Sequence, residues 1–385
     1  MNYNNIQTVV FGQHCLNSLG QIRSLGEIGL APDVVWVSHD FHSPKGSKNI
    51  HKFDEFETFE DALEFIESKY RLQKDVFIFT DSDAAISLLN SKIDFLPKNF
   101  HFFNAGSGGR LLKYMPKYAQ CMLAERCGFN VPKSEIVLNG ELPKTLNYPI
   151  FTKAPDSNGM SWKDSAMICR NKDELLQAFK KISTETILLQ EYIDKDNEVA
   201  VEGLSLNAGD DVYVPIQGEY LRIQEGGFGT WKKNKAYELG DEFRKKLKEM
   251  MKEIRFSGVF EIEFLRDKNG ALYFLEINFR FTQYNYALTR MGVNFCEEYI
   301  KSELDMSYMP KVLSINPQIV INDPKDFRTY VVTGKIKFKS WIKDMHSSDS
   351  YYLFNRADKL YVIRYLINSV YKRLKIRANN LLRKI

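Results

Sequence analysis

Short apolar runs alternate with segments of helical periodicity in the first hundred residues of the chain. The apolar runs, each long enough for a buried strand, cover 6–11, 34–37 and 75–80. Segments in which apolar residues recur every three or four positions follow them, at 19–28, 59–70 and 83–89. The first pattern is typical of strands and the second of amphipathic helices. Their alternation predicts an α/β domain with a parallel sheet.

The middle of the chain has a different pattern, in which strands follow one another directly. Apolar or alternating runs predict strands over 149–153, 187–193, 198–205, 212–218, 259–265 and 272–277. The turn Asp267-Lys268-Asn269-Gly270 separates the last two runs and indicates a β-hairpin. Two helices are expected here, over 117–127 and 241–254. The first of them stops at Gly128, with Pro132 shortly after.

Composition narrows the class of protein. The chain has 385 residues, of which 44% are hydrophobic and 26% charged, so we expect two or three globular domains. Five scattered cysteines without a C-x-x-C argue against a disulfide framework or a zinc ribbon. No H-E-x-x-H occurs, no run approaches about 18 apolar residues, and the N-terminus lacks a basic, apolar leader. These features predict a cytoplasmic protein.

The net charge of +4 hides an uneven distribution. Residues 306–385 carry 16 basic and 5 acidic side chains, whereas the rest of the chain is acidic overall. Within 359–385 there are eight Lys or Arg and no acid, and apolar residues recur at three- or four-residue spacing. This predicts an amphipathic helix with two open interpretations. It docks on its own protein or a twin subunit in a homodimer, or it lies on anionic lipid at the inner face of the membrane. The near-balanced total gives no case for a nucleic-acid partner.

The predicted hairpin carries the most informative polar residues. Glu261 and Glu263 share one face of their strand, and Glu276, Asn278 and Arg280 share one face of theirs. If these faces coincide, they present carboxylates, an amide oxygen and a guanidinium together. Oxygen ligands of this kind suit Mg²⁺ or Mn²⁺, and the guanidinium suits a phosphate or carboxylate. The alternative is a solvated hairpin with cross-strand charge pairs.

Three earlier segments point to a nucleotide. Lys153 ends a strand beside the polar loop 156–161, which contains Gly159, so an ammonium and backbone N–H groups could reach phosphate oxygens there. Backbone groups of the strand around Glu191 could read an adenine edge. Glu198 could accept hydrogen bonds from ribose hydroxyls.

Taken in order, these segments resemble the ATP-grasp superfamily. The matching residues are Lys117…Gly128-x-x-x-Pro132, Tyr148-Pro149-Ile150-Phe151-Thr152-Lys153, Gln190-Glu191-Tyr192-Ile193, Gly258-x-x-x-x-Glu263-Phe264 and Glu276-Ile277-Asn278-x-Arg280 with Gly292. The N-terminal part is similar to the pre-ATP-grasp domain of D-aspartate-ligase-like and carbamoyl-phosphate-synthase-like members. That similarity rests on residues 17–20, 23–29 and 81–83.

The resemblance implies a domain order and a role for each matching residue. The expected domains are a Rossmann-like pre-ATP-grasp domain over 1–114, an ATP-grasp domain of two subdomains over 115–305 and a basic helical segment over 306–385. ATP would be bound through Lys117, Lys153 and Gly159 at the phosphates, Glu191, Tyr192 and Ile193 at adenine, and Glu198 at ribose. Mg²⁺ would be held by Glu263, Glu276 and Asn278. Arg280 would stabilise the transferring phosphoryl group, and Arg222 would contact the phosphate or acyl phosphate.

Two departures from the family pattern stand out. No acidic residue precedes Lys117, and Lys113 is a rival for its role. The loop after Lys153 has one glycine where the family often has several.

The resemblance implies an ATP- and Mg-dependent ligase that activates a carboxylate as an acyl phosphate and joins it to an amine. Expected substrates include an amino acid joined to a cell-wall, polysaccharide or small-molecule acceptor. One alternative is a degenerate nucleotide-binding module without ligase activity. Another is a dinucleotide- or nucleotide-sugar-dependent enzyme built on the N-terminal βαβ pattern, which has no G-x-G-x-x-G.

Overall fold

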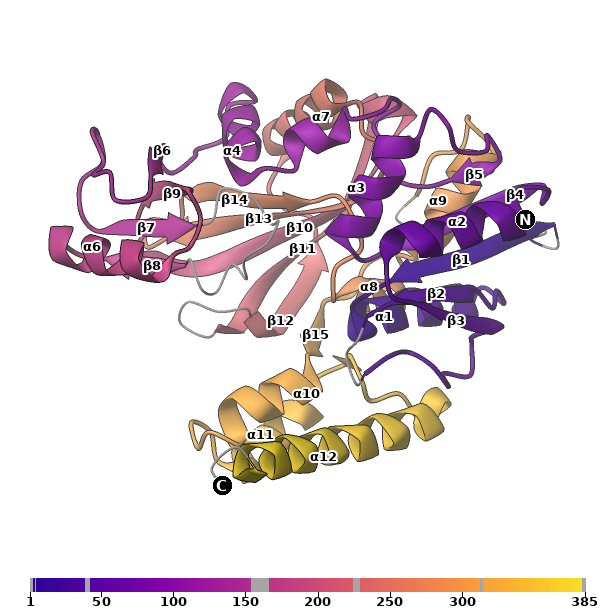
Figure 1. The fold of residues 1–385 in the computed structure, drawn as a ribbon. Coiled ribbons are helices and arrows are strands. Elements are labelled where there is room, and N and C mark those ends of the chain that lie inside the picture. The colour runs from indigo at the N-terminus through magenta and orange to yellow at the C-terminus, as the bar shows by residue number, and fades with distance from the viewer. Residues whose placement is uncertain are drawn as a thin grey trace. The chain divides into compact units, whose positions relative to one another are not determined.

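The computed structural model describes residues 3, 5–38, 42–153, 166–223, 229–311 and 314–382 (Figure 1). The chain divides into two compact units, one formed by residues 1–104 with 279–385 and the other by residues 105–278. These boundaries differ from those predicted, which followed residues 114 and 305. The N-terminal and C-terminal parts of the chain therefore share one unit.

The first unit contains a five-stranded parallel sheet in the order β3-β2-β1-β4-β5. Its strands are β1 (Ile6–Gly12), β2 (Asp33–Val37), β3 (Lys52–Phe56), β4 (Asp75–Thr80) and β5 (Phe100–His101). Three helices connect strands, namely α1 (Cys15–Glu27), α2 (Phe59–Tyr70) and α3 (Asp83–Lys92). The predicted Rossmann-like parallel architecture is confirmed, while β3 is additional because its exposed, charged sequence carries no apolar run.

Local chemistry explains where these helices begin. The side chain of Thr58 accepts a hydrogen bond from the backbone N–H of Asp61 at the start of α2. Ser82 does the same for Ala85 at the start of α3. Such caps satisfy N–H groups that the first helical turn leaves without a partner. The helix starts therefore follow directly from the sequence.

The C-terminal part of the same unit consists of short elements and one long helix. They are α8 (Asn285–Arg290), α9 (Phe295–Leu304), β15 (Gln318–Ile321), α10 (Asp323–Asp326), η3 (Phe327–Val331), α11 (Phe338–His346), β16 (Ser350–Tyr351), η4 (Arg356–Asp358) and α12 (Lys359–Leu382). Strands β15 and β16 pair in parallel.

Arg23 of α1 connects the basic C-terminal segment to the N-terminal sheet. Its side chain is 2% exposed and donates to the backbone carbonyl oxygens of Tyr352, at 2.7 Å, and Leu353, at 2.9 Å. Its Nη2 also lies 3.6 Å from Oδ2 of Asp358. A buried guanidinium with this many acceptors orders both segments, since removing either leaves polar groups buried without partners. This is the physical reason why residues after 305 do not form a unit of their own.

The second unit, residues 105–278, contains two antiparallel sheets. The smaller has the order β6-β9-β7-β8, from β6 (Ser134–Leu138), β7 (Ile150–Lys153), β8 (Met167–Cys169) and β9 (Thr186–Glu191). The larger has the order β14-β13-β10-β11-β12, from β10 (Lys195–Leu206), β11 (Asp211–Ile223), β12 (Gly229–Ala236), β13 (Gly258–Asp267) and β14 (Leu272–Asn278).

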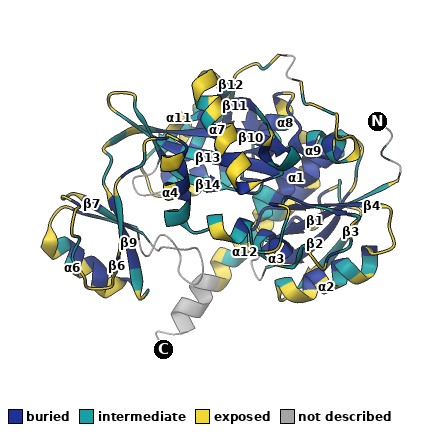
Figure 2. Cartoon of the chain, turned by 90° about the horizontal axis from the view of Figure 1, so that it is seen from above, coloured by how far each residue is buried: buried dark blue, intermediate teal, exposed yellow. Residues whose placement is uncertain are grey.

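Helices and short turns complete this unit. They are η1 (Leu111–Tyr114), α4 (Lys117–Arg126), α6 (Lys172–Lys181), η2 (Asn207–Gly209) and α7 (Asp241–Ile254). The predicted helix over 241–254 has these bounds. Buried residues follow the strands, and the outer faces of α6 and α7 are exposed (Figure 2). In the described part of the chain, no helix combines the length and apolar character needed to cross a membrane.

Candidate active site

The hairpin of β13 and β14 brings the predicted metal ligands onto one face. Glu263 lies opposite Glu276, and Glu261 lies opposite Asn278 in the antiparallel register. Opposed residues of an antiparallel pair project to the same side of the sheet, and so do residues two apart on one strand. All four side chains therefore lie on the same face of the sheet. The sequence alone did not decide whether the faces of the two strands coincide.

The neighbouring strand β10 extends this polar face. Glu202 lies opposite Glu261, and Ala200 lies opposite Glu263. Glu198 and Glu202 flank Ala200 at a spacing of two, so their side chains are on the same face. We call the set Glu198, Glu202, Glu261, Glu263, Glu276 and Asn278 the carboxylate face.

Helix α4 brings a lysine to this face. Lys117 is the first residue of the helix, and its Nζ lies 3.0 Å from Oε2 of Glu276. Gln120, one turn along, accepts a hydrogen bond from the backbone N–H of Ile277 and donates to its carbonyl oxygen, both at 3.1 Å. This two-point contact holds the start of α4 against β14. It explains why Lys117 lies beside Glu276.

Lys153, at the end of β7, belongs to the same group of charges. Its pKa is lowered to about 8, mainly by burial and also by the positive charge of Lys117. The carboxylates of Glu276 and Glu198 oppose this shift. Two lysines that repel one another and sit among carboxylates form a site in which phosphate oxygens would be stabilised.

The carboxylates of the face repel each other. The pKa of Glu263 is raised to about 8, mainly by burial and also by the negative charges of Glu276 and Glu198. The pKa of Glu261 is also raised, by burial and by Glu202. A cation placed between Glu263 and Glu276 would relieve this repulsion. Two carboxylates and the amide oxygen of Asn278 are hard oxygen donors, so the residues present fit Mg²⁺.

This set contains only two carboxylates besides the amide. Among the described residues, no group of three or more His, Cys, Asp and Glu side chains is arranged to hold a metal ion. A bound Mg²⁺ would accordingly keep waters or substrate phosphates as its remaining ligands, as is usual for this ion.

Strand β12 contributes residues that the sequence did not single out. Lys232 is 0% exposed, and its Nζ lies 3.1 Å from Oε1 of Glu202 and 3.9 Å from Oε2 of Glu261. Asn234 is buried as well, and neither atom of its amide has a hydrogen-bond partner. In the sequence both residues belong to the polar run 232–235, which has no feature that marks a buried site.

The predicted adenine and ribose residues lie around the end of β9 and the start of β10. The backbone N–H of Glu191 donates to the carbonyl of Lys133 at 2.8 Å, and that of Tyr192 donates to the carbonyl of Pro149 at 3.3 Å. Ile193 lies two residues after the end of β9. Glu198 pairs with the ammonium of Lys195. The adenine and ribose roles of these four residues stay predictions.

The two predicted arginines belong to different units. Arg222 is near the end of β11, with its guanidinium carbon 4.9 Å from the centre of the Trp231 ring. Arg280 belongs to the first unit, where it donates to both carboxylate oxygens of Asp83, at 2.7 and 3.1 Å. Gly159 and its loop, 156–161, lie outside the described residues.

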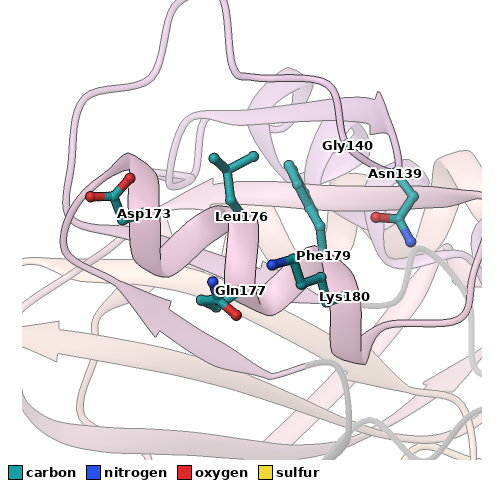
Figure 3. A pocket seen from close by; sticks show the side chains of 7 residues that line it. All are labelled: Asn139, Gly140, Asp173, Leu176, Gln177, Phe179 and Lys180. Carbon is teal, nitrogen blue, oxygen red and sulfur yellow. The ribbon is translucent and has the colours of Figure 1, made fainter.

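A separate hollow of about 490 Å³ lies beside α6 (Figure 3). Its lining consists of Asn139, Gly140, Asp173, Leu176, Gln177, Phe179 and Lys180. None of these residues belongs to the carboxylate face or was predicted to bind a ligand. The hollow therefore adds nothing to the candidate site.

Comparison with known proteins places the fold. No family model matches the chain. The N5-carboxyaminoimidazole ribonucleotide synthase of Staphylococcus epidermidis is 28% identical over 150 residues, which are 38% of this chain and 39% of that protein. The match thus spans well under half of the length of this curated relative.

Solved structures match over a much larger part of the chain. The N5-carboxyaminoimidazole synthetase of Staphylococcus aureus, complexed with ADP, superposes with a TM-score of 0.65 at 17% identity, over 86% of this chain and 88% of that chain. The L-amino acid ligase of Bacillus licheniformis gives a TM-score of 0.63 at 17% identity, over 81% and 79%. The chain therefore has the ATP-grasp fold that its motifs predicted.

Proposed function

We propose that this protein is an ATP- and Mg-dependent ligase that activates a carboxylate as an acyl phosphate and joins it to an amine. The observation that carries the proposal is the convergence of Lys117 and Lys153 with Glu263, Glu276 and Asn278 within one compact unit. Phosphate-binding cations next to oxygen ligands for a divalent ion form the arrangement that phosphoryl transfer from ATP requires. The names of the structural neighbours, which include an L-amino acid ligase, support the same reaction class.

The lysines would bind and orient the triphosphate. Lys117 already contacts Glu276, so a phosphate oxygen would share this ammonium with a metal ligand and lie beside the ion. Lys153 has a pKa of about 8, in part because the positive charge of Lys117 repels its own. A bound phosphate would offset this repulsion and raise the pKa, so that Lys153 would be fully charged. Bound Mg²⁺ would disperse the negative charge that develops on the transferring phosphoryl group. The protein's contribution is thus positioning and electrostatic stabilisation.

An acyl phosphate must then be held while an amine attacks its carbonyl carbon. We assign this role to Arg280 and Arg222, because a guanidinium binds phosphate or carboxylate with two parallel donors. Arg280 makes a bidentate pair with the carboxylate of Asp83, the kind of contact that a phosphate or acyl phosphate would make with it. Phosphate leaves as the new C–N bond forms. The amine acceptor is proposed to be an amino acid, a cell-wall or polysaccharide precursor, or another small molecule.

A screen of ADP release tests this function. Purified protein with ATP and Mg²⁺ should release ADP when pools of carboxylates and amines are supplied together, and much less when either pool is omitted. The competing function is a nucleotide-binding module without ligase activity. It is suggested by the loop after Lys153, which has only one glycine. That module would bind ATP and release no ADP with any pool, which would refute the ligase proposal.

We also propose that the protein is cytoplasmic and contacts anionic lipid through α12. Its large apolar side chains are mostly more than half exposed, at Leu360, Ile363, Leu366, Ile367, Val370, Tyr371 and Leu374. The same stretch carries only basic charged side chains, at Lys359, Arg364, Lys372, Arg373 and Lys375. An exposed apolar stripe with cationic flanks complements an anionic membrane surface. A homodimer that covers this stripe is the alternative outcome of the vesicle experiment given in the Discussion.

A further inference from the structure

Three side chains of the carboxylate face and Lys232, from four strands in all, form a continuous polar line. Glu202 on β10 contacts Lys232 on β12 at 3.1 Å. Lys232 lies 3.9 Å from Glu261 on β13, and Glu261 accepts a hydrogen bond from Asn278 on β14 at 3.5 Å. The line thus ends on the amide that we assign to Mg²⁺.

The two carboxylate oxygens of Glu261 have different partners. Oε2 is the oxygen next to the Lys232 ammonium, and Oε1 accepts from Nδ2 of Asn278. An ammonium can only donate hydrogen bonds, so Lys232 occupies one side of this carboxylate and leaves the other as an acceptor. The –NH₂ group of Asn278 therefore donates to Glu261, and the amide oxygen of Asn278 is left for a different ligand.

The orientation of this amide matters because its two ends differ chemically. Mg²⁺ takes oxygen ligands, while an amide –NH₂ is only a hydrogen-bond donor. An asparagine free to rotate about its terminal bond would present the wrong end part of the time. A hydrogen bond to its nitrogen removes that freedom.

Gly218 on β11 gives Lys232 the room to reach Glu202. A Cβ built on Gly218 would lie 2.2 Å from Cε of Lys232, far inside van der Waals contact. The aliphatic part of the Lys232 side chain therefore crosses β11 directly over Gly218, which has no side chain. This close approach requires glycine at 218.

We propose that Lys232 is a positioning residue for the metal site, which acts through Glu261 to direct the oxygen of Asn278 toward the ion. The inference rests on the Mg²⁺ site of the proposed function. It concerns the orientation of a ligand and does not depend on which carboxylate or amine is used.

The direct test measures binding of Mn²⁺ by electron paramagnetic resonance in the presence of ADP, without any carboxylate or amine. Lys232→Met should raise the Mn²⁺ Kd by roughly 10- to 100-fold, the usual cost of losing a residue that orients a metal ligand. Glu261→Gln should have a similar effect, because its oxygen turns to Lys232 and its –NH₂ then faces Asn278. Gly218→Ala keeps every charge and displaces the lysine stem, so it should weaken Mn²⁺ binding in a protein whose buried charges remain balanced.

The matched control is Lys233→Met, the same change at the exposed neighbour on β12, which should bind Mn²⁺ as the unmodified protein does. In an Asn278→Ala background, Lys232→Met should produce no further loss, because the amide it orients is gone. Thermal melting of each variant identifies those that do not fold. Among folded variants, wild-type Mn²⁺ affinity in both Lys232→Met and Gly218→Ala overturns the inference, as does an undiminished effect of Lys232→Met on Asn278→Ala.

The result is separable from the proposed ligase activity. If the unmodified protein binds Mn²⁺ with ADP but releases no ADP from ATP with any substrate pool, the ligase function fails and the positioning role can still hold. If it ligates substrates but its Mn²⁺ affinity is insensitive to Lys232, the positioning role alone fails.

Discussion

The carboxylate face of the second unit and helix α12 of the first unit are opposite exceptions to ordinary burial. Ionisable groups are buried in this face and beside it, with Glu261 of the face 3% exposed and the adjacent Lys232 0% exposed. Helix α12 exposes large apolar groups, among them Leu360 at 83%. Buried charge and exposed apolar surface both cost free energy in a protein that acts alone. The difference supports the two proposals made above, namely that the carboxylate face binds a cation with phosphates and that α12 contacts an apolar, anionic surface.

The largest expected effect concerns Arg23, which binds the segment that precedes α12. Arg23→Met leaves Asp358 buried and removes donors from two backbone carbonyls. We expect the free energy of unfolding to fall by about 3–5 kcal/mol, as for other broken buried ion pairs. Chemical denaturation monitored by circular dichroism measures this. Arg71→Met, which removes an exposed pair with Glu67, should change stability very little. Equal stabilities of the two variants would contradict the view that Arg23 joins the basic segment to its unit.

The next effect tests the carboxylate face directly. Glu276→Ala removes both the partner of Lys117 and a predicted metal ligand, so ATP turnover to ADP should fall at least about 100-fold. Turnover is measured with a coupled ADP assay on the substrate pools. Glu253→Ala, which removes an exposed glutamate paired with Arg126, is the control and should keep full turnover. Full turnover in Glu276→Ala would show that the metal assignment is wrong.

A smaller effect is expected for the exposed stripe of α12. Ile363→Ser with Ile367→Ser should lower the partition of the protein onto phosphatidylglycerol vesicles roughly tenfold, since each isoleucine would lose part of its burial in lipid. Co-sedimentation with those vesicles, and with neutral phosphatidylcholine vesicles, measures it. If the variant and the unmodified protein pellet equally with the vesicles, the lipid interpretation is wrong. A stripe that is covered in a dimer would instead show as a change of mass in light scattering.

The smallest effect is a pH dependence. Because burial and Lys117 lower the pKa of Lys153 to about 8, its ammonium is lost as the pH rises through 8 rather than near the ordinary lysine value of roughly 10.4. The Kd for ADP in metal-free buffer should therefore increase roughly three- to tenfold between pH 7 and pH 9. Calorimetry at several pH values measures this change. Lys153→Arg stays charged and should flatten the profile, and an equally steep profile in that variant would assign the titration to another group.

Much of the fold could be predicted because its elements follow local rules. The apolar run at 75–80 became β4, and the amphipathic patterns at 59–70 and 241–254 became α2 and α7 with the expected bounds. The positions of Glu261, Glu263, Glu276 and Asn278 on two strands of a hairpin were also predicted, and the structure has that hairpin. That these residues hold a metal ion stays a prediction. Strand periodicity and helix periodicity are properties of the nearest neighbours in the chain, so the sequence reveals them.

Other features depend on residues that are far apart in the sequence. Lys232 and Asn234 lie in a polar run typical of an exposed strand, and the register of β10, β11 and β12 buries them. The tertiary structure likewise joins residues 279–385 to the N-terminal sheet through Arg23.

The sequence by itself determined the order of strands and helices along the chain, the polar residues of the hairpin and the uneven distribution of charge. Only the tertiary structure decided that Glu202 and Glu261 share one buried ammonium, that Lys117 meets Glu276, and that the apolar stripe of α12 faces outward. The physical reason is that burial and electrostatic pairing are set by which surfaces pack together. Periodicity indicates that a segment has an apolar or polar face, but the partner of that face is chosen by contacts across the whole fold.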